Sequence, residues 1–301
     1  MIVISIIVPS NLVIGGSAYI QNLIADTHRE LNTMSETIEF DFLNTGFIAG
    51  EMTVLLGMLL KEVHRAGKKY KLSNISAQVS KALTRNNFLP YFQGGNSLID
   101  SYNNTIQFHC GDARDDSSLN DYLNSQVFKN IHWNDVTNGQ EEQEQISSAI
   151  HELAINVYQH STVNEVMCCG QYYPNKHELS FALGDNGISI PNSIISSGKY
   201  NSNSDSDIIN WATKKGTSTK EEAASGLGLY SVKNKLTSSG GLTIISRYGY
   251  WRQLPSSENN EIITFDLSNS PLRGTFIHFS LDTDTRVTNN VNNNDLQNLF
   301  F

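Results

Sequence analysis

The chain has 301 residues, of which 30 are acidic and 21 basic, so its formal net charge is -9. This acidic excess argues against a general nucleic-acid-binding protein, because such proteins neutralise phosphates with lysine and arginine. Three cysteines without framework spacing argue against a disulfide-stapled secreted domain, and no apolar run approaches the roughly 20 residues of a membrane span, so we expect a cytoplasmic protein. The length of the chain predicts about two domains.

The first third of the sequence alternates between β-type runs and helical patterns. In chain order it predicts a strand at Ile2–Val8, a helix at Ser17–Leu31, a strand at Thr37–Phe42, a helix at Glu51–His64, a strand at Tyr70–Leu72 and a helix at Ser76–Asn86. The helix at Glu51–His64 is strongly apolar, and Gly67 follows it as a stop signal. This order of strands and helices indicates a small α/β domain.

Residues 94–140 are less regular and carry polar stretches, with one strand predicted at Thr105–Cys110. We place a domain junction near Gln140. The adjacent Cys168 and Cys169 fall in a predicted strand, where their side chains point to opposite faces, and we interpret both as core-filling residues. The final segment, 283–301, is rich in asparagine and predicts a mobile tail.

A helix predicted at Glu141–His160 carries an apolar stripe and, beside it, two polar side chains of interest. Glu152 and Asn156 are four positions apart and therefore share a face that borders the core. An amide oxygen is a hard ligand for Mg²⁺, and a carboxylate beside it can activate a nucleophile near a terminal phosphate. The alternative is an ordinary solvated helix face. Zinc is not expected, because no histidine stands at position 155 to complete a site with His151.

The predicted strand Leu179–Leu183 runs into Asp185-Asn186-Gly187. A carboxylate in this place can accept a hydrogen bond from an exocyclic amino group such as that of adenine. Gly187 has no Cβ and lets the backbone approach a base closely. An unremarkable loop is the alternative, since Asp followed closely by Gly is a common turn signal.

Further along, Gly226-Leu227-Gly228-Leu229 leads into a helix predicted at Tyr230–Leu236. Backbone N–H groups at such a helix start favour anions, and the nearby Lys220 can add positive charge over phosphates. The polar segment 195–224 predicts a mobile lid.

Strands predicted at Leu242–Ser246, Ile262–Phe265 and Thr275–Leu281 complete an α+β sandwich with helices on one face of its sheet.

These motifs, in this order, resemble those of the GHKL superfamily of ATPases and kinases, whose ATP-binding domain is the Bergerat fold. Glu152-Leu-Ala-Ile-Asn156, extended by His160, is similar to the N-box of that family, and Asp185-Asn-Gly187 is similar to its first glycine box. Gly226-Leu227-Gly228-Leu229 is similar to the second glycine box, and Gly274-Thr275 to the start of the final strand. Ser189 departs from the pattern, since many members have a second glycine there.

The resemblance covers about residues 141–282 and implies ATP and Mg²⁺ as cofactors. It implies that Asn156 binds Mg²⁺, that Glu152 is the general base and that Asp185 reads the adenine amino group with Gly187 beside it. The resemblance further implies that Gly226 and Gly228 face the phosphates, and that Thr275 supports the water network of Asp185. No phosphoacceptor-histidine hairpin is evident upstream, so the domain is most similar to the anti-sigma-factor serine kinases of bacteria.

The N-terminal residues 1–93 faintly resemble STAS domains, the antagonists of anti-sigma factors, through the segment Ile38–Ile48 and the apolar helix after Gly50. A generic α/β regulatory domain is the alternative. The STAS phosphoacceptor serine is expected just after Phe47-Ile48, but that stretch reads Ala49-Gly50-Glu51-Met52 without a hydroxyl. Thr53 is the nearest hydroxyl, and we expect it to face the core.

The expected organisation is therefore a STAS-like α/β domain (1–93), a connecting region (94–140), a GHKL-type α+β sandwich (141–282) and a mobile tail (283–301). The leading functional hypothesis is an ATP- and Mg²⁺-binding regulatory protein with slow ATPase or protein serine/threonine kinase activity. Its expected partners are proteins, as in an anti-sigma-type network, with no nucleic acid and no membrane; homodimerisation is left open. The alternative is a non-catalytic ATP-gated interaction module, which includes a defence or stress effector.

Overall fold

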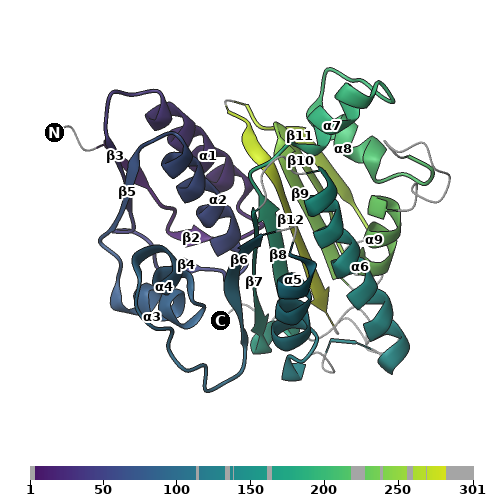
Figure 1. Cartoon of the computed structure of the whole chain (residues 1–301), viewed down its shortest axis with the longest axis horizontal. Helices are drawn as coiled ribbons and strands as arrows, with labels where there is room; N and C mark the ends of the chain where they lie inside the picture. The colour runs from purple at the N-terminus through teal and green to yellow at the C-terminus, as the bar shows by residue number, and fades with distance from the viewer. Residues whose placement is uncertain are drawn as a thin grey trace, which may run out of the picture.

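The architecture is that of a computed structural model of the whole chain (Figure 1). The structure describes residues 4–112, 115–132, 136–137, 139–160, 165–217, 228–237, 240–255, 260–268 and 270–282, without the side chains of 116, 157–160, 228 and 282. The predicted tail at 283–301 lies outside the described residues. In the described part, the chain has a mixed α/β structure with a small parallel sheet and a large antiparallel sheet.

The small sheet is formed by the N-terminal part of the chain. Its strands β1 (Ile4–Ile7), β3 (Thr37–Asp41) and β5 (Lys69–Ser73) are parallel and stand in the order β1-β3-β5. A separate two-stranded parallel sheet is formed by β2 (Asn11–Leu12) and β4 (Phe47–Ile48). The connecting helices are α1 (Ser17–Leu31), α2 (Met52–Arg65), α3 (Ala77–Arg85) and α4 (Phe88–Gln93). The predicted alternation of strands and helices in this part is confirmed, and α4 is an addition to it.

The large sheet has seven strands, and every neighbouring pair is antiparallel. Its order is β11-β10-β9-β12-β8-β7-β6. The strands are β6 (Thr105–Asp112), β7 (Glu165–Tyr173), β8 (Glu178–Asp185), β9 (Gly240–Arg247), β10 (Gly249–Gln253), β11 (Ile262–Asp266) and β12 (Leu272–Asp282). Strand β6 comes from the segment 94–140 and forms the edge next to β7, so that segment contributes to the sheet as well as connecting to it.

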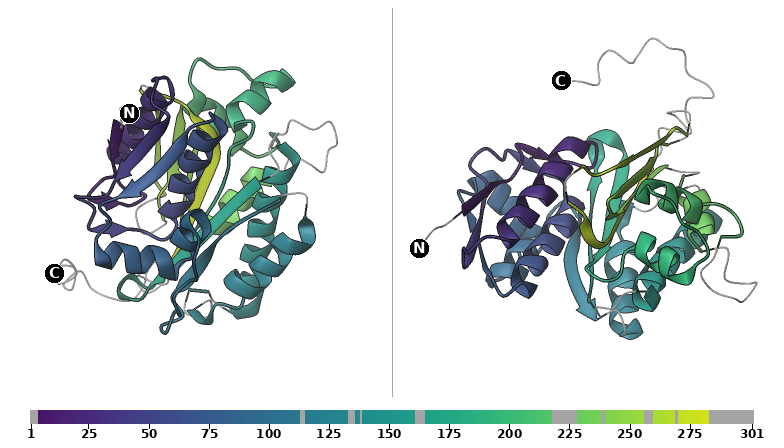
Figure 2. Two further views of the ribbon diagram at one scale, coloured as in Figure 1. Left: turned by 60° about the vertical axis from the view of Figure 1, so that its left-hand side comes forward. Right: turned by 90° about the horizontal axis from the view of Figure 1, so that it is seen from above.

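Helices from residues 116–237 cover one face of the large sheet, as Figure 2 shows. They are α5 (Asp116–Tyr122) with the π-helical turn η1 (Leu123–Val127), α6 (Gly139–His160), α7 (Ile190–Ser197), α8 (Asp205–Ala212) and α9 (Gly228–Thr237); the 3₁₀ turn η3 (Pro174–Lys176) joins β7 to β8. Helix α6 packs against α9, and both contact the sheet. The predicted helices Glu141–His160 and Tyr230–Leu236 are thereby confirmed within a few residues.

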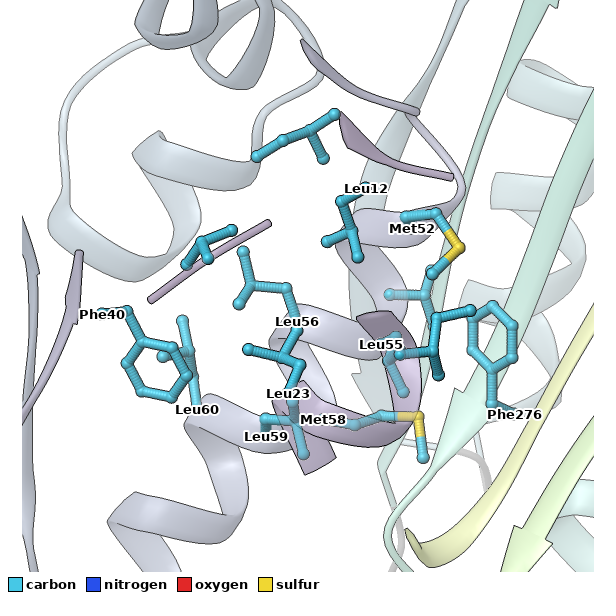
Figure 3. Packing of buried hydrophobic residues seen from close by; sticks show 14 of the residues in the cluster. Leu12, Leu23, Phe40, Met52, Leu55, Leu56, Met58, Leu59, Leu60 and Phe276 are labelled. Atoms are coloured by element: carbon cyan, nitrogen blue, oxygen red, sulfur yellow. The ribbon is translucent and has the colours of Figure 1, made fainter. Parts of the chain in front are cut away.

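Helix α2 covers the opposite face of the large sheet and is the layer between the two sheets. Nearly all of its side chains are buried, which fits a helix that is apolar all round. One continuous apolar cluster joins residues of the small sheet, α2 and the large sheet (Figure 3), including Phe40, Leu55 and Phe276. We refer to the close approach of Val54 and Met58 on α2 to Gly184 on β8 as the α2–sheet interface. The two halves of the chain thus share a core.

The two adjacent cysteines of β7 show how the sheet separates two cores. Cys169 belongs to the cluster on the α2 side, whereas Cys168 belongs to the cluster beneath α6 and α9. Both are fully buried and free, so the prediction that they fill the core on opposite faces is confirmed. The side chain of Thr53 is also fully buried, as expected, and its hydroxyl donates a 2.6 Å hydrogen bond to the carbonyl of Gly50.

The segment 195–224 is more ordered than the expected lid. Residues 205–212 form α8, whose N-terminus is capped by Ser204, and Asp266 accepts hydrogen bonds from the backbone N–H groups of Asp205 (3.1 Å) and Ser206 (2.8 Å). The helix packs on β10 and β11, so this part of the lid expectation is wrong. Serine and aspartate, which look like loop residues in the sequence, serve here as helix caps. Residues 218–224 lie outside the described residues.

Among the described residues, no helix combines the length and the apolar character that crossing a bilayer requires.

Candidate functional site

Three polar side chains stand in a row at one end of the large sheet, on the face that α6 and α9 cover. Asp185 ends β8, Thr275 lies directly opposite it on β12, and Ser246 lies opposite Thr275 on β9. In a strand, alternate side chains share a face. Leu183, Ile277 and Ile244, each two positions further along these strands, all belong to the core beneath α6 and α9. We call Asp185, Thr275 and Ser246 the polar row.

Hydrogen bonds join the polar row to the turn that follows β8. Asp185 is 3% exposed, and its Oδ1 accepts a 2.7 Å hydrogen bond from the N–H of Gly187. The hydroxyls of Ser246 and Thr275 are 2.8 Å apart, and the Ser246 hydroxyl accepts a 2.9 Å bond from the N–H of Ile190 at the start of α7. The turn is therefore fixed at both ends.

Ser189, which stands where a second glycine is expected, has a local structural role. Its backbone is extended, and its hydroxyl accepts a 3.2 Å hydrogen bond from the N–H of Asn192, so it is the N-cap of α7. Pro191 occupies the first turn, where its missing N–H has no helical partner to lose. The departure at Ser189 thus starts a helix immediately after the turn.

Gly274 brings β12 against the end of β8. Its φ is +80°, which favours glycine, and a Cβ built there would overlap the carbonyl oxygen of Asp185. The close approach therefore needs a residue without a side chain. This gives a physical reason for the Gly274-Thr275 pair beside Asp185.

Glu152 and Asn156 are both half-buried on α6, at the edge of the helix layer. Burial raises the pKa of the Glu152 carboxyl above its usual value, and the positive charge of Lys235 on α9 acts in the opposite direction. A carboxyl with a raised pKa is a better proton acceptor when ionised. Leu229, in the first turn of α9, packs partly buried against the same core.

The structure brings Asp185, Gly187 and Thr275 together directly, and it places Glu152, Asn156 and Leu229 on the two helices above that face of the sheet. His160 and Gly228 lie within α6 and α9, and the structure describes only the backbone of these two residues. Lys220, Gly226 and Leu227 lie outside the described residues.

No group of three or more histidine, cysteine, aspartate or glutamate side chains able to hold a metal occurs in the described part of the chain. The donors on α6 are a carboxamide and a carboxylate, and oxygen donors of this kind suit Mg²⁺. Because Mg²⁺ in nucleotide sites keeps waters and phosphate ligands, a single protein oxygen such as that of Asn156 is compatible with it.

Two features of the site are not predicted from the sequence. The first is Ser246, for which the sequence predicts only a place at the end of a strand. A hydroxyl directly after the apolar pair Ile244-Ile245 could have indicated a polar site there. The second is Asn186, whose side chain reaches α2 in the N-terminal part of the chain. A contact over such a separation leaves no local pattern in the sequence.

No protein-family model matches the chain, and no curated protein sequence matches it significantly. The resemblance to GHKL and STAS proteins therefore stays a prediction from motifs. The polar row beneath α6 and α9 is the candidate functional site of the described structure.

Proposed function

We propose that the chain is a cytoplasmic regulatory protein that binds ATP with Mg²⁺ through a GHKL-type domain at about 141–282 and signals through protein partners. The observation that carries the proposal is the polar row, in which a buried aspartate at a strand end is aligned with a threonine on the next strand. Buried polar groups on an otherwise apolar face are typical of sites that orient a ligand.

The surroundings of the polar row support an adenine nucleotide in particular. The Asp185 carboxylate can accept a hydrogen bond from an exocyclic amino group, and the N–H of Gly187 fixes its orientation. Helix α6, which contacts β7 and β8, carries Asn156 as a candidate oxygen ligand for Mg²⁺ and Glu152 as a candidate base. The start of α9 at Gly228 is a helix N-terminus, and such ends favour phosphate.

The proposed chemistry is slow transfer of the terminal phosphoryl group to water or to a serine or threonine of a protein. Bound Mg²⁺ would neutralise charge on the phosphates. In this proposal Asp185 and Thr275 position the adenine ring of the nucleotide. Glu152 accepts a proton from the attacking water or hydroxyl group. The raised pKa of Glu152 supports this role.

The N-terminal part, 1–93, fits a STAS-like or related α/β regulatory domain within this proposal. The buried position of Thr53 and the lack of a hydroxyl at 49–52 argue against regulation by phosphorylation there. Protein partners, as in an anti-sigma-type network, would then bind at surfaces other than residues 49–53. Self-association into a homodimer is a separate question.

ATP titration by calorimetry, with and without Mg²⁺, tests the proposal. Wild type should bind ATP more tightly with Mg²⁺, and Asn156→Ala should lose that dependence while its circular dichroism spectrum stays unchanged. Absence of ATP binding by the wild type would refute the proposal.

Incubation with γ-labelled ATP then separates the activities. Label on protein identifies a kinase and free phosphate an ATPase. Binding without either supports the alternative, a non-catalytic ATP-gated module, which the shared core of the two halves favours because it gives a route for a conformational signal.

A further inference from the structure

The turn Asp185–Gly187 has two faces, and they belong to different parts of the molecule. Asp185 shares the strand face of Leu183, toward α6 and α9, where the polar row lies. Asn186 points the other way, toward α2, and is 2% exposed. Consecutive residues of one turn therefore contact the proposed nucleotide site and the N-terminal part of the chain.

Asn186 is held on the α2 side by both its side chain and its backbone. Its Nδ2 donates a 3.0 Å hydrogen bond to the carbonyl of Met58, in the middle of α2. Its backbone carbonyl accepts hydrogen bonds from Nη1 of Arg65, at the end of α2 (3.2 Å), and from Nε of Arg273, before Gly274 (3.1 Å). Bonds from a guanidinium are charge-assisted and stronger than neutral ones.

The packing around these bonds leaves little room for independent movement. A Cβ built at Gly184 would stand 2.5 Å from the Met58 sulfur and 2.8 Å from Cγ1 of Val54. Helix α2 therefore lies directly on the backbone of β8, one residue before Asp185. Because close-packed interfaces transmit displacement instead of absorbing it, a shift of α2 must move the end of β8.

We propose that Asn186 is a positioning residue that couples α2 to the Asp185 carboxylate, so that nucleotide binding and the seating of α2 on the sheet reinforce each other. This inference rests on the proposed ATP site, because the coupling is between α2 and that ligand. A ligand that fixes Asp185 then stabilises the α2–sheet interface. By thermodynamic linkage, a partner that pulls α2 away lowers the affinity for that ligand, and the ligand lowers the affinity for the partner by the same factor. The N-terminal part of the chain thereby regulates the site without touching the ligand.

The test combines ATP titration with amide hydrogen exchange on the full chain. In wild type, ATP should slow exchange both at 185–187 and along α2 (52–65). In Asn186→Ala, ATP affinity should fall by about 5- to 100-fold, the effect of losing one buried hydrogen bond, and ATP should no longer slow exchange in α2. Asn192→Ala removes an exposed asparagine of α7 and should match wild type in both measurements.

A milder pair of variants serves if Asn186→Ala does not fold. Arg65 is exposed, so Arg65→Ala should fold and should reduce the ATP-induced protection of α2. Arg65→Lys keeps the charge and should restore part of the protection. If ATP slows amide exchange in α2 as much in Asn186→Ala, or in Arg65→Ala, as in wild type, the proposal is overturned.

The same measurements distinguish this inference from the proposed function. If wild type binds no ATP, the proposed function fails, and the positioning role is judged on exchange without ligand. Faster exchange at 185–190 in Asn186→Ala than in Asn192→Ala would then support the link between α2 and the turn. Equal exchange would overturn it.

Discussion

The phenol of Tyr173 on β7 donates a 2.8 Å hydrogen bond to the carboxyl of Glu51, which lies at the N-terminus of α2. The same phenol oxygen accepts a 3.1 Å bond from the N–H of Gly50. Glu51 stands in the stretch where a STAS domain would carry its phosphoacceptor, and here that stretch is buried against the large sheet. The position is thus part of the contact between the two halves of the chain.

Glu51 should make stability depend on pH. Burial raises the pKa of its carboxyl from 4.5 to about 7, the negative charge of Glu178 adds to this rise, and the Tyr173 hydrogen bond opposes it. A carboxyl with a raised folded-state pKa contributes stability that is present below pH 4.5 and is lost as the pH rises through about 7. The loss is at most about 3 kcal/mol, at 1.36 kcal/mol per pKa unit.

Glu51→Gln should therefore unfold at higher denaturant concentration than wild type at pH 8 and should show a flatter stability profile between pH 4.5 and 7. Denaturant unfolding across this range measures both. Glu36→Gln, at an exposed position, should keep the wild-type profile. Parallel profiles for Glu51→Gln and wild type would mean that the pKa of Glu51 is the same in the folded and the unfolded chain.

Gly274→Ala should destabilise the protein and disturb the site. The φ of +80° strains any residue with a Cβ, and the Cβ would overlap the Asp185 carbonyl. Gly216→Ala is the matched control, because Gly216 also has a φ of +80° but faces open space. We expect about 1 kcal/mol of destabilisation for the control and a further 1–3 kcal/mol for Gly274→Ala, by denaturant unfolding. Equal losses would show that β12 can move away from β8.

Asp185→Asn keeps the size of the side chain but removes its charge and one acceptor. We expect adenine-nucleotide affinity to fall about 10- to 100-fold, because a hydrogen bond to a charged group contributes about 1.5–3 kcal/mol. Discrimination between ATP and GTP should narrow at the same time. Asp207→Asn changes an exposed aspartate of α8 and should leave both quantities as in wild type. If Asp185→Asn discriminates between ATP and GTP as wild type does, Asp185 does not recognise the adenine amino group.

Glu152→Gln should separate binding from turnover. The amide cannot accept a proton, so turnover should fall by about 10²- to 10⁴-fold while ATP affinity stays within about threefold. Glu144→Gln, an exposed change on the same helix, is the comparison. Phosphate release and calorimetric titration measure the two quantities. Undiminished turnover in Glu152→Gln would assign the base to another residue.

Much of the architecture was predictable because local patterns decide it. The helix at Ser17–Leu31 is found with the predicted bounds, and α2, α6 and α9 follow from apolar spacing and stop signals. The separation of Cys168 and Cys169 follows from the two-residue period of a strand. Helix α8 was missed because Ser204 and Asp205 resemble loop residues until their capping partner, Asp266, is known.

Local residue patterns were enough to predict the period of each element, the apolar character of α2, the turn with Asp185 and Gly187, and the helix with Glu152 and Asn156. Long-range packing sets the remaining features: α2 lies between two sheets, β6 forms the edge of the large sheet, and Thr275 and Ser246 stand beside Asp185. The same packing brings Asn186 into hydrogen-bond contact with Met58. These contacts join residues far apart in the chain, and they form only when burial of shared apolar surface brings the segments together.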